Sequence, residues 1–177
     1  SAEEISAPFP YRFDPLPELP DWRSASFRKS SVFKAAILLF ASGEDALGER
    51  FITHLAETLS DREIDQMTDF LEEYQRPHVL VMLGKRKASQ GKNFPRPYFA
   101  LHPLAQEGYS VPAQLSLSIA RRESEFDPKV VSPVGAAGIM QVMPRTAREM
   151  AEKIGVRYDQ TRMTRDWKYN ARLGTAY

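Results

Sequence analysis

The sequence predicts an all-α protein, and three observations lead to this fold class. Apolar residues recur every three or four positions across residues 29–91, which is the period of an amphipathic helix. Ser60 and Glu63 have the spacing of a capping box, a motif that begins helices. Pro77 and Pro144 each precede a further apolar stripe, and proline is favoured in the first turn of a helix.

The composition excludes several classes of protein. The 177 residues carry 24 Lys and Arg against 23 Asp and Glu, and the resulting net charge of +1 gives no overall attraction to nucleic acid or to anionic membranes. The longest apolar run, residues 35–41, is too short to span a bilayer. The absence of cysteine excludes disulfides and thiolate chemistry. We expect no metal site, since the histidines lack the short spacing of metal ligands: His54, His78 and His102.

The chain divides into four segments. Residues 1–28 combine five prolines with several aromatic residues, which predicts an extended strap packed against a neighbouring element. Residues 29–91 predict short helices in hairpins, as in a superhelix. Residues 92–109 are interpreted as a linker, and residues 110–177 as a further helical domain.

The apolar stripe of residues 29–91 defines the expected core of the hairpin segment. Its members are Phe33, Ile37, Phe40, Leu47, Phe51, Leu55, Leu59, Ile64, Met67, Leu71 and Tyr74. Gly43 interrupts the pattern and is expected to separate two helices.

Basic residues gather in residues 84–98, namely Lys85, Arg86, Lys87, Lys92 and Arg96. They could form an anion-binding patch. Cations are also favoured at helix C-termini and in solvated linkers, and we prefer this second interpretation because the whole chain is close to neutral.

Residues 110–120 fit two patterns. The alternation of apolar and polar side chains is typical of a half-buried strand. Pro112, two residues after Ser110, instead suits the first turn of a helix with a serine cap, and we favour the helix. A later helix is expected to begin at Pro144 and to end at Gly155.

Three short motifs lie within residues 123–147. They are Glu123-Ser124, then Ser132-Pro133-x-Gly135-Ala136-x-Gly138-Ile139-Met140-Gln141, then Met143-Pro144-x-Thr146-Ala147. In this combination, and with the Asn170 to Tyr177 segment, they strongly resemble the catalytic segment of the soluble lytic transglycosylases. The resemblance covers about residues 98–177, and the helical region before them is similar to the tail of the superhelical domains of that family.

The resemblance implies a lysozyme-like helical domain that acts on peptidoglycan in the periplasm. Such enzymes cleave the β-1,4 bond between N-acetylmuramic acid and N-acetylglucosamine without water and leave a 1,6-anhydro ring. The glycan strands would be the partner, and no cofactor is implied. The N-terminal residues themselves carry no basic and apolar leader that would show the compartment.

Glu123 is the expected catalytic residue. If the C6 hydroxyl of the sugar attacks C1, one carboxyl group can first donate a proton to the leaving oxygen and then remove the hydroxyl proton. The first step requires a raised pKa, so we expect a poorly solvated pocket around Glu123. We interpret the neighbouring acids Glu125 and Asp127 as solvation of a helix end.

The resemblance also implies substrate contacts. Ser124 would bond the glutamate or the substrate, and we favour this role over the alternative of a helix C-terminal serine that bonds to the backbone. Gly138 would let the backbone approach a sugar, Met140 would contact a sugar face, and Gln141 would donate amide hydrogen bonds. For Met140 the alternative is core filling.

Relatives in this family extend well beyond a position equivalent to Tyr177. We therefore expect a truncated catalytic domain that retains the acid but has an open or unstable cleft, with weak activity or none. Two alternatives remain open from the sequence: a hydrolytic muramidase of the same fold, and a helical scaffold that binds peptidoglycan without turnover.

Overall fold

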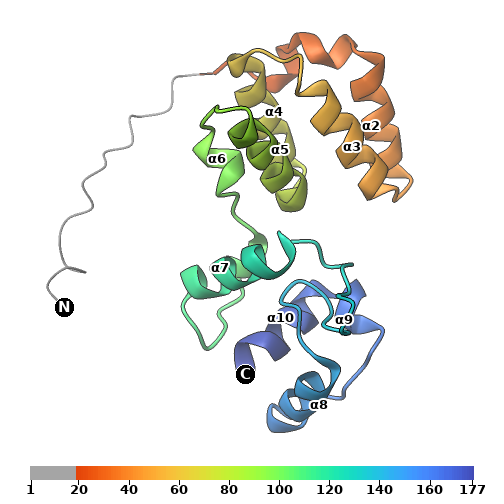
Figure 1. The fold of residues 1–177 in the computed structure, drawn as a ribbon, viewed down its shortest axis with the longest axis vertical. Helices are drawn as coiled ribbons and strands as arrows, with labels where there is room; N and C mark the ends of the chain where they lie inside the picture. The colour runs from red at the N-terminus through yellow and green to blue at the C-terminus, as the bar shows by residue number, and fades with distance from the viewer. Residues whose placement is uncertain (1–18) are drawn as a thin grey trace, which may run out of the picture.

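The computed structural model describes residues 19–177, and within them every regular element is helical. Two lobes follow one another along the chain (Figure 1). The N-terminal lobe comprises residues 19–100 and the C-terminal lobe residues 101–177. Most of the expected strap, including Phe9, Tyr11 and Phe13, lies outside the described residues.

The elements of the N-terminal lobe are η1 (Trp22–Ser24), η2 (Ser26–Lys29), α2 (Ser31–Ala41), α3 (Asp45–Leu55), α4 (Asp61–Glu73), α5 (Pro77–Ser89) and α6 (Pro95–Tyr98). Those of the C-terminal lobe are η3 (Pro103–Gln106), α7 (Ala113–Ser124), α8 (Pro144–Lys153), α9 (Arg162–Arg165) and α10 (Trp167–Ala176). Among these helices none is long and apolar enough to cross a membrane.

Local signals place the starts of the N-terminal helices. The capping box is confirmed: the Ser60 hydroxyl accepts from the Glu63 amide, and the Glu63 carboxylate accepts from the Ser60 amide. Pro77 is the first residue of α5, as predicted. The core prediction was wrong at Leu47, Phe51 and Tyr74, which are more than a third exposed.

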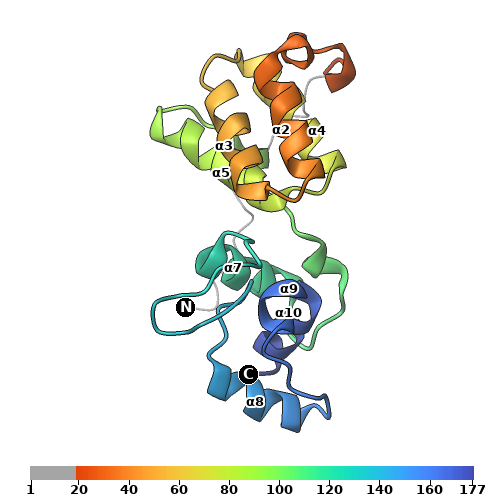
Figure 2. The same cartoon turned by 90° about the vertical axis from the view of Figure 1, so that its right-hand side faces the viewer.

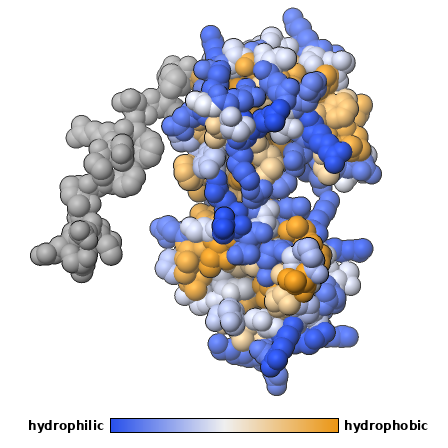
Figure 3. Space-filling model, viewed as in Figure 1, coloured by the Kyte–Doolittle hydropathy of each residue, from blue (hydrophilic) through white to orange (hydrophobic). Residues whose placement is uncertain are grey.

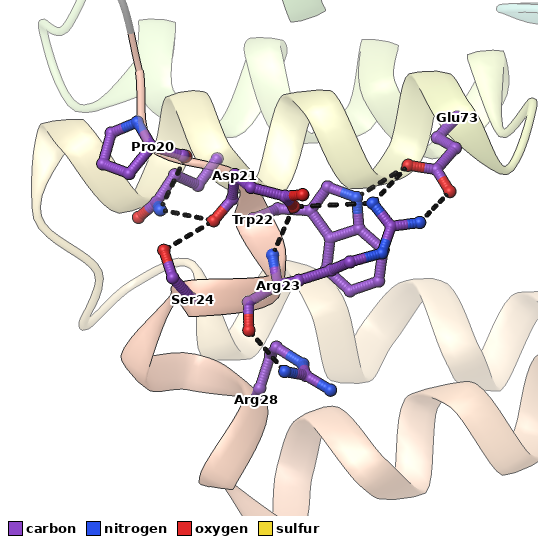
Figure 4. Close-up of polar contacts among 8 residues, drawn as sticks. Pro20, Asp21, Trp22, Arg23, Ser24, Arg28 and Glu73 are labelled. Atoms are coloured by element: carbon purple, nitrogen blue, oxygen red, sulfur yellow. Dashed lines mark hydrogen bonds and ion pairs between the residues drawn. The ribbon is translucent and has the colours of Figure 1, made fainter.

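The N-terminal end of the described chain is fixed to α4. Trp22 is 9% exposed and packs edge-on against Phe70, while its indole N–H donates to Glu73 at 2.8 Å (Figure 4). The side-chain amide of Gln66, which also lies in α4, donates a hydrogen bond to the Pro20 carbonyl. Packing against a neighbour is therefore seen for Trp22, but the expected extended conformation is wrong for residues 22–24 and 26–28, which lie in two 3-10 turns.

The segment interpreted as a linker is partly helical. Helix α6 lies so close to α5 that a Cβ on Gly84 would come within 2.4 Å of the Tyr98 backbone nitrogen. This close approach requires glycine at position 84 and joins α6 to the N-terminal lobe.

Residues 113–124 are helical, so the favoured interpretation of the 110–120 pattern is confirmed. The expected serine cap is wrong. Pro112 occupies the cap position without a side-chain bond, and the Ser110 hydroxyl instead donates to the Thr175 carbonyl of α10. Ser110 thus bonds to a distant helix and does not cap the helix that follows it.

Beyond α7 the chain runs as a wide loop beside α9 and α10 (Figure 2). Helix α8 then begins at Pro144 as predicted, and Gly155, with a φ of +67°, follows its last turn. Helix α10 contacts both α8 and α9 and carries the most buried residues of the C-terminal lobe.

Candidate active site

Glu123 lies in the last turn of α7 and is exposed to solvent. Leu115 and Ile119, eight and four residues earlier, share its face of the helix and are 47% and 38% exposed. Apolar surface is visible on the lower lobe in the region of α7 (Figure 3). Glu123 therefore stands at the end of an uncovered apolar stripe.

The expected poorly solvated pocket around Glu123 is not formed by residues 19–177. No other described side chain makes a hydrogen bond or ion pair with Glu123, and it lines none of the four main clefts of the described chain. Nothing in the described part of the chain packs over the face that carries Leu115, Ile119 and Glu123, and the poorly solvated pocket stays a prediction.

Ser124 connects α7 to the loop of the sequence motif. Its hydroxyl lies 2.7 Å from the Ile139 carbonyl and 3.1 Å from the Ala120 carbonyl of its own helix. The hydroxyl is thus bonded to backbone, which was the alternative to a substrate contact. In this arrangement Ser124 fixes the loop beside Glu123.

The loop of residues 130–142 is closed by backbone bridges between Val131 and Ala137 and between Ala137 and Val142. Gln141 adopts a left-handed conformation with a φ of +47°. Its side-chain amide donates to the carbonyls of Val130 and Gly138 at 3.1 and 2.9 Å. Gln141 therefore closes the loop with the amide that we expected to face the substrate.

Gly138 allows a close approach, but to protein rather than to a sugar. A Cβ at this position would lie 2.1 Å from the Met163 carbonyl oxygen, and the φ is +77°. Met140 is 6% exposed and packs against Gly174, which corresponds to core filling. Gly135, with a φ of +89° and open space around it, requires glycine for its conformation alone.

Asn170 organises this loop from α10, and this role was missed in the sequence. The side chain is fully buried. Its Oδ1 accepts from the Met140 amide at 2.9 Å, and its Nδ2 donates to the carbonyls of Ala137 and Met163 at 2.8 and 3.1 Å. Its place in a recognised motif was the only available signal, because the bonds to Ala137 and Met140 join residues 33 and 30 positions apart in the sequence.

The two other acids near Glu123 are occupied elsewhere. Glu125 is the left-handed residue that ends α7, and its carboxylate pairs with Lys85 of α5. The Asp127 carboxylate accepts from the Lys129 amide at 2.8 Å. Of these three acids, Glu123 alone has no hydrogen-bond or ion-pair partner for its carboxylate among residues 19–177.

His78 bridges the two lobes. Its Nδ1 lies 2.8 Å from the Glu125 carbonyl oxygen, and its Nε2 lies 3.0 Å from the Glu49 carboxylate. Burial disfavours the charged ring, but the hydrogen bonds to Glu49 and Glu125, with the negative charges of Glu49 and Asp127, outweigh burial and raise the pKa of His78.

A cleft of about 730 Å³ lies between the lobes, where the surface is visibly hollowed (Figure 3). His102, Phe126 and Trp167 contribute aromatic lining. The His102 Nδ1 accepts from the Leu104 amide, which makes this histidine a helix cap. Burial lowers the pKa of His102 to about 4, so the ring is neutral near pH 7.

The basic residues of the 84–98 segment are engaged within the protein. Lys85, Arg86, Lys92 and Arg96 each form ion pairs with carboxylates. Lys87 is 2% exposed and donates to the Ala56 carbonyl at the end of α3. This pairing leaves little positive charge for an external anion.

Comparison with known proteins identifies the class of the fold. The 70 kDa soluble lytic transglycosylase of Escherichia coli superposes with a TM-score of 0.73 at 23% identity, over 99% of this chain and 29% of that one. Its complex with bulgecin A gives 0.74 over the same shares, and an inactive mutant of the lytic transglycosylase Slt of Pseudomonas aeruginosa gives 0.69. The chain therefore has the helical, lysozyme-like fold of these structures.

The sequence comparisons are more specific. Residues 103–177 match the family model of the Transglycosylase SLT domain. The soluble lytic murein transglycosylases of E. coli K12 and Salmonella typhimurium are 37% and 34% identical over 98 residues, or 55% of this chain. The chain spans about 15% of the length of these curated relatives.

Proposed function

We propose that the chain is part of a periplasmic lytic transglycosylase that cleaves peptidoglycan glycan strands, with Glu123 as its acid. The observation that carries the proposal is the position of Glu123. It is the exposed carboxyl group at the end of α7, next to the SLT motif loop, and it is uncommitted within the described chain. The relatives named as soluble lytic murein transglycosylases support the substrate class.

In the proposed reaction Glu123 donates its proton to the glycosidic oxygen while the bond from C1 to that oxygen breaks. The C6 hydroxyl of the N-acetylmuramic acid then attacks C1. The Glu123 carboxylate takes up the hydroxyl proton, so the acid is regenerated and a 1,6-anhydro ring results. No second carboxylate is needed, which agrees with the engagement of Glu125 and Asp127 elsewhere.

The uncovered stripe of α7 suits the substrate. Leu115 and Ile119 offer apolar contact to a sugar face beside Glu123. A glycan strand bound over this stripe would remove water from the carboxyl group and favour its protonated form. Gly138, Met140, Gln141 and Ser124 would then act by shaping the loop next to the strand, as their backbone contacts support.

The test is mass spectrometry of purified sacculi incubated with the 177-residue chain and with the full product of its gene. We expect 1,6-anhydro ends with the full product, little or no turnover with the shorter chain, and loss of the ends with Glu123→Gln. Glu152→Gln, at an exposed glutamate of α8, is the matched control. Reducing ends would instead indicate a hydrolytic muramidase, and intact sacculi that retain the protein would indicate a non-catalytic scaffold.

A further inference from the structure

We propose that His78 is a positioning residue for Glu123: from α5 it holds the turn that ends α7, through the Glu125 carbonyl. This inference deepens the proposed function and rests on it. It assigns part of the site to the N-terminal lobe, outside the residues 103–177 that match the SLT family model.

The turn that follows Glu123 is conformationally unfavourable. Glu125 and Phe126 both adopt positive φ angles, +54° and +68°. Side chains with a Cβ disfavour this region, and neither residue is glycine or asparagine. Two consecutive residues of this kind persist only where surrounding contacts hold them, so the groups that bond to them determine how α7 ends.

The N-terminal lobe supplies two of these contacts from a single helix. The His78 ring meets the Glu125 carbonyl oxygen at 2.8 Å, and Lys85 pairs with the Glu125 carboxylate. His78 is itself held from the other side by Glu49 of α3 at 3.0 Å. Since both partners of the ring are acceptors, both ring nitrogens donate, and the ring is fixed between α3 and the turn.

A second contact between the lobes involves Arg121, on the N-terminal side of Glu123 in the sequence. The Arg121 guanidinium donates to the Tyr98 carbonyl through Nε at 3.1 Å and Nη2 at 2.8 Å. Residues 121 and 125 are thus each bonded to the N-terminal lobe, and Glu123 lies midway between them. The direction of the last turn of α7, and with it that of Glu123, is set by the hairpin segment.

Two substitutions separate the contacts of His78. His78→Asn keeps a donor near the position of Nδ1, which faces Glu125, and loses the contact with Glu49. His78→Gln keeps a donor near the position of Nε2 and loses the contact with Glu125. Because both variants remove the imidazole, general damage to the lobe junction affects them equally.

The first measurement is amide hydrogen exchange by NMR in the 177-residue chain. The Glu125 and Asp127 amides bond within the turn, to the Arg121 and Ser124 carbonyls. We expect their exchange to be about tenfold faster in His78→Gln than in His78→Asn. The Ala147 amide in α8 serves as the internal control and should not change. Equal exchange in the two variants overturns the inference, whether or not the protein is an enzyme.

The second measurement is turnover of sacculi by the full gene product. We expect kcat to fall about tenfold in His78→Gln with KM unchanged, and to fall less in His78→Asn. A rise in KM alone would contradict a positioning role. If Glu123→Gln leaves cleavage intact, the proposed function fails, while the exchange measurement still decides whether His78 holds the turn.

Discussion

Replacement of Asn170 by alanine tests whether one buried amide holds the motif loop. The substitution removes three hydrogen bonds, from the Met140 amide and to the Ala137 and Met163 carbonyls. The Ala137 carbonyl keeps a second partner, the Val142 amide. The Met140 amide and the Met163 carbonyl then have no side-chain partner within the described chain and remain buried.

The expected loss of unfolding free energy follows from these three hydrogen bonds. One hydrogen bond with a remaining partner contributes about 1 kcal/mol, and each buried group left without a partner costs about 1–3 kcal/mol. We therefore expect Asn170→Ala to lower the free energy of unfolding by about 3–7 kcal/mol. Asn170→Asp should also destabilise, because its second oxygen would face the Ala137 and Met163 carbonyls where the amide now donates.

The assay is urea unfolding followed by far-UV circular dichroism. Asn93→Ala is the matched control, because Asn93 is an exposed asparagine in an irregular segment, and it should change stability by less than about 0.5 kcal/mol. A loss below about 1 kcal/mol for Asn170→Ala would refute the reasoning, since a single net hydrogen bond would then account for the whole effect.

Two further predictions concern stability. Gly138→Ala should lower the Tm more than Gly135→Ala: both glycines have positive φ, at a cost of about 1–2 kcal/mol for alanine, but only at Gly138 would the Cβ meet a backbone oxygen, at 2.1 Å. Similar Tm values for the two variants would contradict this. The His102 ring takes up a proton below pH 6.5 in the unfolded chain and only near pH 4 in the folded chain. The free energy of unfolding of the wild type should therefore fall by about 3 kcal/mol as the pH is lowered from 6.5 to 4. His102→Asn, which keeps a capping oxygen, should lack that component in pH-dependent urea unfolding.

Most helices were predictable because their signals are local. The Ser60 and Glu63 pair, Pro77 and Pro144 each act within one turn of chain, and the structure places helix starts at all of them. Ser110 shows the limit of this reasoning. It has the right type and spacing for a cap, but its hydroxyl bonds to α10, sixty-five residues away.

The site was predictable in its residues and less so in their contacts. Glu123 and the loop were found from motifs, whereas the bonds of Ser124 and Asn170 depend on which segments become neighbours. The turn at Glu125 and Phe126 was unpredictable for a different reason. Neither residue favours positive φ, so only contacts from outside the turn impose it.

The hydrogen bonds of Arg121 and Glu125 to the N-terminal lobe couple the contact between the lobes to the conformation of the end of α7. Thermodynamic linkage then acts in both directions. A molecule that binds and separates the lobes would loosen the contacts that orient Glu123. A glycan bound against Glu123 would oppose that separation by the same coupling free energy. The hairpin segment can thereby communicate strain from elsewhere in a longer protein to the carboxyl group without touching the substrate.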